Sequence, residues 1–139
     1  INVMAEKLKL EMVTPYKQVL SEEVDELTLP GLVGDLGILP GHTPLLTTLR
    51  VGEMSYKKGN QHFHVAVNWG YVEIDEDAVT VLVDTAEKSD EIDLARAKAA
   101  MGRAEQALKT LSQEDKSYAI MERALQRALI RIQVAGKRR

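Results

Sequence analysis

The segment Gly31-Leu-Val-Gly-Asp-Leu-Gly-Ile-Leu-Pro-Gly-His-Thr-Pro-Leu-Leu46 holds four glycines and two prolines between closely spaced apolar residues. Glycine permits positive φ and close backbone approach, while proline fixes φ and removes a hydrogen-bond donor. The apolar side chains need burial, so the segment predicts a series of tight, packed turns rather than a flexible linker. Those side chains are Leu32, Leu36, Ile38, Leu39, Leu45 and Leu46.

Short strands are predicted on both sides of this segment. Leu8, Leu10 and Met12 alternate with charged residues, the period-two pattern of a half-buried strand. Further strands are predicted at 16–20, 24–29, 45–50, 54–56, 62–68, 71–74 and 79–83, with turns at 21–23, 58–60 and 75–77. Eight or more short strands at close spacing predict an antiparallel β-sandwich or barrel.

The composition changes near residue 87, where alanine and charged residues replace proline and most of the glycine. Two helices of about 20 residues are expected. Ser89 or Asp90 is expected to cap the first, and Ser112-Gln-Glu-Asp115 to start the second. The second helix has an apolar face of Ala124, Leu125, Ala128, Leu129 and Ile132.

The fold class is therefore α+β in two parts, a β-sandwich or barrel at 1–87 and an antiparallel two-helix hairpin at 88–139. Met4 reads as a natural start and residues 1–3 as an added sequence. A hairpin of this size has a limited core, so it must pack on another surface. That surface is either its own β domain, with the helices folded back, or a partner protein, with the helices extended.

Charge and composition exclude several classes of function. The chain has no cysteine, which removes disulfides and thiolate chemistry, and it shows no membrane-spanning apolar run and no signal peptide. Its net charge of −3 divides into −7 through residue 86 and +4 from residue 87 onward. The basic second part favours an acidic protein surface or a phosphate-bearing ligand. No groove-entering or aromatic motif accompanies it, so nucleic acid is not expected as a partner.

Candidate catalytic and metal-binding groups have simpler interpretations. Gly31, Gly34 and Gly37 lack the Lys-Ser/Thr of a phosphate loop and are interpreted as turn residues. His62 and His64 share a strand face but have no evident third ligand, so no metal site is predicted. No nucleophile motif surrounds the serines, so a turn-stabilising role is predicted for His42 and no catalytic residue is expected.

Acidic and basic clusters also have a simple interpretation as solvated faces. Four acids at positions 22, 23, 25 and 26 are interpreted as a turn and strand edge rather than as catalytic carboxylates. Arg123, Arg127 and Arg131 recur every four residues on one face of the second helix, and Arg96 and Arg103 share a face of the first. A charged helix face is usually just exposed to solvent, unless a ligand or partner covers it.

Several motifs resemble the ε subunit of bacterial F-type ATP synthases. Residues 34–46 resemble its glycine- and proline-rich signature, and Asn68-Trp-Gly-Tyr-Val-Glu73 resembles a strand in which glycine or serine is commoner at the first two positions. Residues 79–86 resemble its last N-terminal strand, and Ile92-Asp-Leu-Ala-Arg-Ala97 its helical nucleotide motif. The resemblance covers about 130 residues, in the family's order.

This resemblance implies a non-catalytic rotor subunit with no required cofactor. Its sandwich would bind the γ subunit and the c-subunit ring, at the cytoplasmic face of the bacterial inner membrane, and would be membrane-associated only through the complex. Its hairpin would inhibit ATP hydrolysis by reaching the α and β subunits. The loop residues Gly34, Asp35 and Leu36 would contact the c ring, and the basic face Arg123, Arg127 and Arg131 would dock on the partner.

The resemblance also implies ATP as a regulatory ligand of the folded hairpin. The residues at the family's nucleotide-binding positions are Glu87, Asp93, Arg96, Arg103, Arg127 and Arg131. Guanidinium groups suit phosphate oxygens, and carboxylates suit the ribose and adenine donors. Two other classes stay open, an independent ATP-hydrolysing enzyme and a purely structural rotor clamp without ligand.

Overall fold

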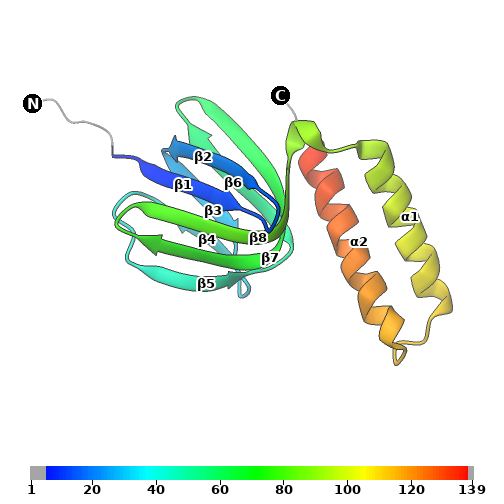
Figure 1. Ribbon diagram of the computed structural model, residues 1–139. Helices are drawn as coiled ribbons and strands as arrows, with labels where there is room; N and C mark the ends of the chain where they lie inside the picture. The colour runs from blue at the N-terminus through cyan, green and yellow to red at the C-terminus, as the bar shows by residue number, and fades with distance from the viewer. Residues whose placement is uncertain (1–5, 138–139) are drawn as a thin grey trace, which may run out of the picture.

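The computed structural model describes residues 6–137, and the predicted start at Met4 with residues 1–3 lies outside them. Eight strands form a β-sandwich, and two antiparallel helices lie beside it, which confirms the predicted fold class (Figure 1). The elements are β1 (Leu8–Val13), β2 (Gln18–Val24), β3 (Glu26–Pro30), β4 (Asp35–Ile38), β5 (Leu45–Leu49), β6 (Gly52–Lys58), β7 (Gln61–Asp75), β8 (Ala78–Lys88), a 3₁₀ turn (Ser89–Glu91), α1 (Leu94–Thr110) and α2 (Lys116–Ala135).

The long strands β7 and β8 belong to both layers of the sandwich. The hydrogen-bonded order is β2-β1-β8-β7-β6-β3-β4, and β5 also pairs with β7. Residues 61–67 of β7 pair with β6, whereas residues 70–74 pair with β5. β8 pairs with β7 along its length, and its first residues also pair in parallel with β1. The two strands thus pass from one layer into the other, which leaves one continuous eight-stranded sheet folded on itself.

The change of layer occurs at Gly70. The core-facing residues of β7 have odd numbers before this point and even numbers after it, namely Val65 and Val67, then Val72 and Ile74. Trp69 has a positive φ of 39°, which marks the break in the period-two pattern. A β-carbon at position 70 would lie 1.9 Å from the carbonyl oxygen of Leu82. Only glycine permits this approach of β7 to β8.

The core of the sandwich receives apolar side chains from all eight strands. Leu8, Leu10 and Met12 are fully buried, as their alternation predicts. The burial predicted for the glycine- and proline-rich segment is only partly correct. Ile38 is buried, and Leu36 and Leu45 pack against the core. In contrast, Leu32, Leu39 and Leu46 are exposed, because they lie in loops or on an outward-facing strand position.

The predicted strands and turns are wrong at three places. The segment predicted as turns contains β4, which pairs with β3 and so satisfies its main-chain groups. The turn predicted at 21–23 lies within β2, because those residues pair with β1 and the strand ends only before the bend at Asp25. The strands predicted at 62–68 and 71–74 form the single strand β7, since pairing with β8 continues across the bend.

Two hairpin turns agree with the sequence. Glu76 and Asp77 connect β7 to β8 with positive φ values of 48° and 64°, and Gly59 begins the connection from β6 to β7 with a φ of 59°. Two-residue turns with positive φ match the twist of the flanking strands. These turns fix the register that places Glu53, Ala66 and Glu87 side by side on three neighbouring strands.

Aspartates cap both helices: Asp93 caps α1 in place of the predicted Ser89 or Asp90, and Asp115, the last residue of the segment predicted to start the second helix, caps α2. The side chain of Asp93 accepts a hydrogen bond from the main-chain N–H of Arg96 at 3.1 Å, and that of Asp115 accepts from Ser117 at 2.8 Å. Ser89 and Asp90 lie in the preceding 3₁₀ turn, because Ile92 and Asp93 return to extended conformations before α1 begins. Both caps satisfy free N–H groups at the helix start.

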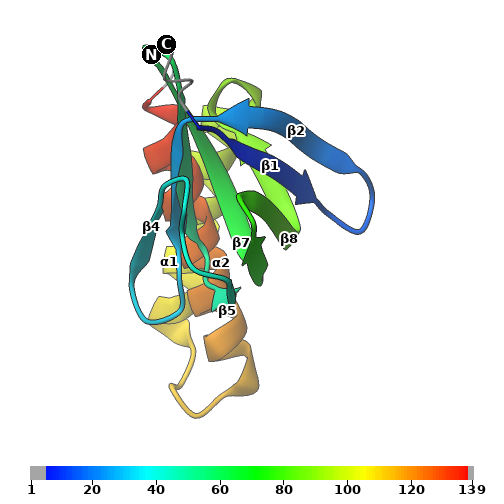
Figure 2. The same cartoon turned by 90° about the vertical axis from the view of Figure 1, so that its left-hand side faces the viewer.

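The hairpin is folded against its own sandwich, one of the two arrangements that the sequence leaves open. α2 lies next to the sandwich and α1 on its far side (Figure 1), and the loop between them projects past the strands (Figure 2). The buried alanines Ala97, Ala104 and Ala128 let the two helices approach closely. Leu129, predicted on the apolar face, is 47% exposed, whereas Val134 near the end of α2 is buried.

Candidate functional site

A small apolar cluster attaches α2 to the outer face of the sandwich. Ala66 of β7 lies in it with Ile92, Val134 and Ala135, and Ile130 packs against them. Ala66 is outward-facing, between the core residues Val65 and Val67, so its short side chain allows the helix to lie close to the sheet. Between this attachment point and the loop that joins the two helices, the hairpin and the sheet diverge and leave a cleft (Figure 1).

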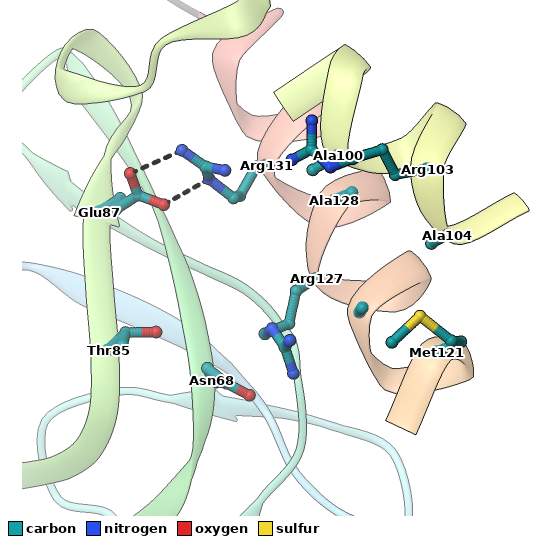
Figure 3. A pocket seen from close by; sticks show the side chains of 11 residues that line it. Asn68, Thr85, Glu87, Ala100, Arg103, Ala104, Met121, Arg127, Ala128 and Arg131 are labelled. Atoms are coloured by element: carbon teal, nitrogen blue, oxygen red, sulfur yellow. Dashed lines mark hydrogen bonds and ion pairs between the residues drawn. The ribbon is translucent and has the colours of Figure 1, made fainter. Parts of the chain in front are cut away.

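The cleft has a volume of about 560 Å³ and is lined by both parts of the protein (Figure 3). β7 and β8 contribute polar side chains, α1 and α2 contribute arginines, and alanines leave the space between the helices and the sheet open. The lining residues are Asn68, Thr85, Glu87, Ala100, Arg103, Ala104, Met121, Ala124, Arg127, Ala128 and Arg131. We call this space the cationic cleft. It exists only while the hairpin is folded against the sandwich.

Glu87 and Arg131 form a bidentate ion pair at one end of the cationic cleft (Figure 3). The guanidinium Nε donates to Oε1 at 2.6 Å, and one terminal nitrogen donates to Oε2 at 3.2 Å. Both side chains are partly exposed, at 36% and 27%. Parallel donors of this kind match a carboxylate, and they would match two phosphate oxygens equally well.

A second hollow of about 380 Å³ adjoins the cationic cleft, since both are lined by Ala100, Arg103 and Arg131. Arg96 also lines this hollow. The fold therefore brings four guanidinium groups from two helices to two adjoining spaces, with Arg127 in the cleft as the fourth. Such a set of donors suits a ligand that carries several phosphate groups.

The six residues at the predicted nucleotide positions are thus placed unequally. Glu87, Arg103, Arg127 and Arg131 line the cationic cleft, and Arg96 lines the adjoining hollow. Asp93 lines neither and caps α1 through its side chain.

Asn68 and Thr85 also line the cleft and were not among the predicted site residues. They are paired across β7 and β8 and lie on the sheet side of the cleft, to the left of Arg127 in Figure 3. The side-chain oxygen of Asn68 is buried and has no hydrogen-bond partner, although such an oxygen usually has one. The signal in the sequence was the asparagine itself, at a position where the resembled strand more often has glycine or serine.

The remaining predicted sites lie away from the cleft. Asp35 accepts a hydrogen bond from Arg50 at 2.8 Å, Leu36 packs against the sandwich core, and Gly34 is exposed. Val33, next to them, is fully exposed. Arg123 is exposed on α2 and lines neither the cleft nor the hollow, unlike the two other arginines of its face.

The histidines have the structural environments of ordinary polar residues. His42 lies in a turn, where its ring Nδ1 contacts the carbonyl oxygen of Thr43 at 2.6 Å. His64 contacts Glu53 at 3.1 Å. Within residues 6–137, no group of three or more His, Cys, Asp or Glu residues is arranged to hold a metal ion. No helix in this part of the chain is long and apolar enough to cross a membrane.

The sandwich, the folded hairpin and the cationic cleft place the protein among small two-part proteins that join a β-sandwich to a helical hairpin. Residues 7–89 match the β-sandwich domain of the ATP synthase delta/epsilon chain, and residues 90–136 match its long alpha-helix domain. The chain belongs to this family, which confirms the resemblance found in the sequence.

Similar proteins of bacteria cover nearly the whole chain. The ATP synthase epsilon chain of Geobacter metallireducens is 68% identical over 134 residues, covering 96% of this chain and 97% of that one. The epsilon chain of Geobacter sulfurreducens is 66% identical and epsilon chain 2 of Syntrophotalea carbinolica 67% identical, with the same coverage.

Solved structures share the fold at low sequence identity. A chain in the mitochondrial ATP synthase structure of Euglena gracilis, described as OSCP/F1/c-ring, aligns with a TM-score of 0.79 at 22% identity, covering 96% of this chain and 83% of that one. A chain in the central stalk and c-ring structure of the Tetrahymena thermophila mitochondrial enzyme aligns with a TM-score of 0.56 at 14% identity, covering 97% and 98%. These likenesses show the fold of the sandwich and hairpin together.

Proposed function

We propose that the chain is a non-catalytic central-stalk subunit of a bacterial F-type ATP synthase. In this role the sandwich binds the γ subunit and the c-subunit ring, and it couples proton transport to ATP synthesis. The subunit is peripheral, on the cytoplasmic face of the cell membrane. Family membership over both parts of the chain and the bacterial relatives support this role.

The c-ring contact is proposed for the loop at Gly34, Asp35 and Leu36. The fully exposed Val33 and the half-exposed Leu32 adjoin this loop. Because Leu36 is partly covered by the core, the exposed atoms of the contact come mainly from Gly34, Asp35 and these two neighbours. Apolar residues that remain exposed beside a tight turn are typical of a surface that binds another protein.

The hairpin is proposed to inhibit ATP hydrolysis when it extends toward the α and β subunits. Its basic face, Arg123, Arg127 and Arg131, would then dock on an acidic surface. In the folded arrangement only Arg123 of this face is exposed, since the other two line the cleft. Folding therefore withholds two of the three arginines from a partner.

ATP is the ligand proposed for the cationic cleft, and the observation that carries this proposal is the convergence of four arginines on the cleft and the hollow beside it. A triphosphate would replace the carboxylate of Glu87 as a partner of Arg131, which frees that carboxylate for a ribose or adenine donor. Because both parts of the protein line the cleft, ATP would favour the folded hairpin, as a ligand favours the state that binds it better.

The test is a calorimetric titration of the isolated chain with ATP, with GTP as the comparison ligand. We expect saturable, ATP-selective binding that is lost when Arg127 and Arg131 are both replaced by alanine. Arg123→Ala is the matched control, because it removes the same group from the same helix outside the cleft. Unchanged ATP binding in the double variant would refute the site. Absence of binding at millimolar ATP would leave the arginines as a protein-docking face.

Inhibition has its own test. The chain is added to F1 complexes that lack it, and ATP hydrolysis is measured. We expect a fall in hydrolysis that the Arg123→Ala, Arg127→Ala, Arg131→Ala triple variant no longer produces. An equal fall with the triple variant would contradict the basic-face proposal. No fall with either protein would favour a structural rotor clamp.

A further inference from the structure

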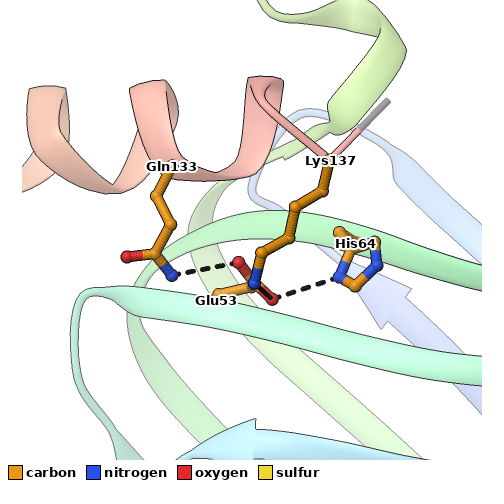
Figure 4. A network of polar contacts seen from close by, with 4 residues as sticks. All are labelled: Glu53, His64, Gln133 and Lys137. Atoms are coloured by element: carbon orange, nitrogen blue, oxygen red, sulfur yellow. Dashed lines mark hydrogen bonds and ion pairs between the residues drawn. The ribbon is translucent and has the colours of Figure 1, made fainter. Parts of the chain in front are cut away.

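A network of polar contacts around Glu53 joins the end of α2 to the sandwich (Figure 4). It lies on the side of Ala66 away from the cationic cleft, because Glu53 is paired with Ala66 from β6, whereas the cleft residue Glu87 is paired with it from β8. Gln133 donates to Oε1 of Glu53 at 3.1 Å, and Lys137 donates to Oε2 at 2.8 Å. The ring Nδ1 of His64 contacts the same Oε2 at 3.1 Å. We call these four residues the Glu53 network.

The sheet register explains why one helix meets two acids. Ala66 of β7 is paired with Glu53 of β6 on one side and with Glu87 of β8 on the other. The three side chains form a row across the outer face, with an alanine between two carboxylates. The helix lies over the alanine, so each carboxylate faces one flank of α2.

The helix presents matching donors on its two flanks. Ile130 and Val134 are four residues apart and occupy the middle of the contact. At 100° per residue, Arg131 lies on one side of that line and Gln133 on the other. Lys137, in the turn just after α2, reaches the same carboxylate as Gln133. Arg131 meets Glu87, whereas Gln133 and Lys137 meet Glu53. Only the first of these two attachments lies in the cationic cleft.

Glu53 is better enclosed than an ordinary surface acid. Its side chain is 14% exposed, compared with 36% for Glu87 and 43% for Lys137. Burial by itself would raise the pKa of Glu53. The hydrogen bonds from Lys137, Gln133 and His64 outweigh burial and hold the pKa below the ordinary value of 4.5. The carboxylate therefore stays charged and draws its compensation from α2.

We propose that Glu53 is a docking site for the C-terminal turn of α2 and holds the hairpin in the folded arrangement without nucleotide. The Glu87–Arg131 attachment shares a residue pair with the cationic cleft, so a bound phosphate group would compete for it. No residue of the Glu53 network lines the cationic cleft, so a bound phosphate group would not compete for it. The network therefore sets the fraction of chains with a folded hairpin before any ligand binds. This inference concerns the isolated chain and does not depend on ATP binding.

The single tryptophan gives a direct measurement of docking. Trp69 lines a groove of about 390 Å³ together with Gln126, Leu129 and Ile130 of α2, so its surroundings change when the helix leaves. The absence of cysteine allows a second measurement. Spin labels on cysteines introduced at the exposed positions Glu6 and Lys116 would report the distance from sandwich to hairpin.

The variants are Glu53→Gln and Lys137→Gln, with Glu73→Gln as the matched control. Glu73 is exposed on β7 and loses the same charge without facing α2. We expect the ratio of undocked to docked chain to rise about three- to tenfold in each of the first two variants. In the double variant it should rise little beyond the Glu53→Gln value, because that variant has already lost the ion pair with Lys137. The control should match the wild type.

An unchanged docked fraction in Lys137→Gln and Glu53→Gln would overturn the proposal, and so would an equal rise in Glu73→Gln. Lys137→Gln distinguishes undocking of the hairpin from unfolding of the sandwich, since this exposed residue is outside the sandwich core. If ATP binds, undocking should weaken the apparent affinities for ATP and GTP by the same factor, because only the fraction of folded hairpin changes. A change in the ATP to GTP ratio would place Glu53 in the ligand site instead.

Discussion

Replacement of Gly70 by alanine should destabilise the sandwich severely. The new β-carbon would lie 1.9 Å from the carbonyl oxygen of Leu82, and 2.8 Å from the Cα of Val83. Non-bonded atoms need roughly 3.5 Å, so β7 and β8 would have to separate by about 1.5 Å. Overpacking costs about 1–3 kcal/mol, and each weakened ladder hydrogen bond adds about 1 kcal/mol. We expect a loss of about 3–4 kcal/mol in the free energy of unfolding.

The measurement is urea and thermal unfolding of the isolated chain, followed by circular dichroism. For a domain of this size, the expected loss lowers Tm by roughly 12 °C or more. Gly102→Ala is the control, because outside the neighbouring backbone of α1 no atom lies within 4 Å of the new methyl group. That variant should be as stable as the wild type or about 0.5–1 kcal/mol more stable. A Gly70→Ala variant that melts within about 3 °C of the wild type would refute the close-approach argument.

Three further predictions concern the hairpin. Asp93→Ala should cost about 1 kcal/mol through loss of the α1 cap, seen as fraying of the first turn in amide hydrogen exchange, and equal protection in both proteins would contradict it. Ala128→Leu should force the helices apart and undock them, measured by Trp69 emission, because Ala128 is 2% exposed between α1 and α2. Since the folded pKa of Glu53 lies below 4.5, its stabilising contribution is present above that pH and is lost as pH falls through the lowered pKa. Acid should therefore undock the hairpin of the wild type, and Glu53→Gln should not show this acid-induced undocking. An identical acid transition in the two proteins would contradict the prediction.

The sandwich and the hairpin could be predicted because their signals are local. Alternating residues such as Leu8, Leu10 and Met12 define a strand without knowledge of its partner. The spacing of small residues in the second part likewise predicts two closely packed helices. Strand β4 could not be predicted in this way, because its glycine-rich sequence has low strand preference and only pairing with β3 makes it extended.

The candidate site was predictable only where a motif identified it. The resemblance singled out Glu87 and the arginines, but it gave Asp93 the same weight, whereas the structure uses this residue as a helix cap. Asn68 belongs to a motif to which no ligand role was assigned, and it enters the cleft through its pairing with Thr85. Glu53 could not be found from the sequence, because its partners lie 11, 80 and 84 residues away and meet only in the folded hairpin.

The sandwich core is much larger than the apolar contact between hairpin and sandwich, and this difference indicates which part of the molecule is able to move. Among residues 6–137, eighteen buried side chains form the core of the sandwich, whereas four form the contact with the hairpin, and two of those four are alanines. At about 25 cal/mol per Å² of apolar surface, so small a contact contributes only a few kcal/mol. The polar attachments at Glu53 and Glu87 are then a large fraction of the docking free energy. Because a ligand or partner needs only about 5.5 kcal/mol of differential affinity to shift an equilibrium from 1:99 to 99:1, a hairpin held in this way can be switched while the sandwich stays folded.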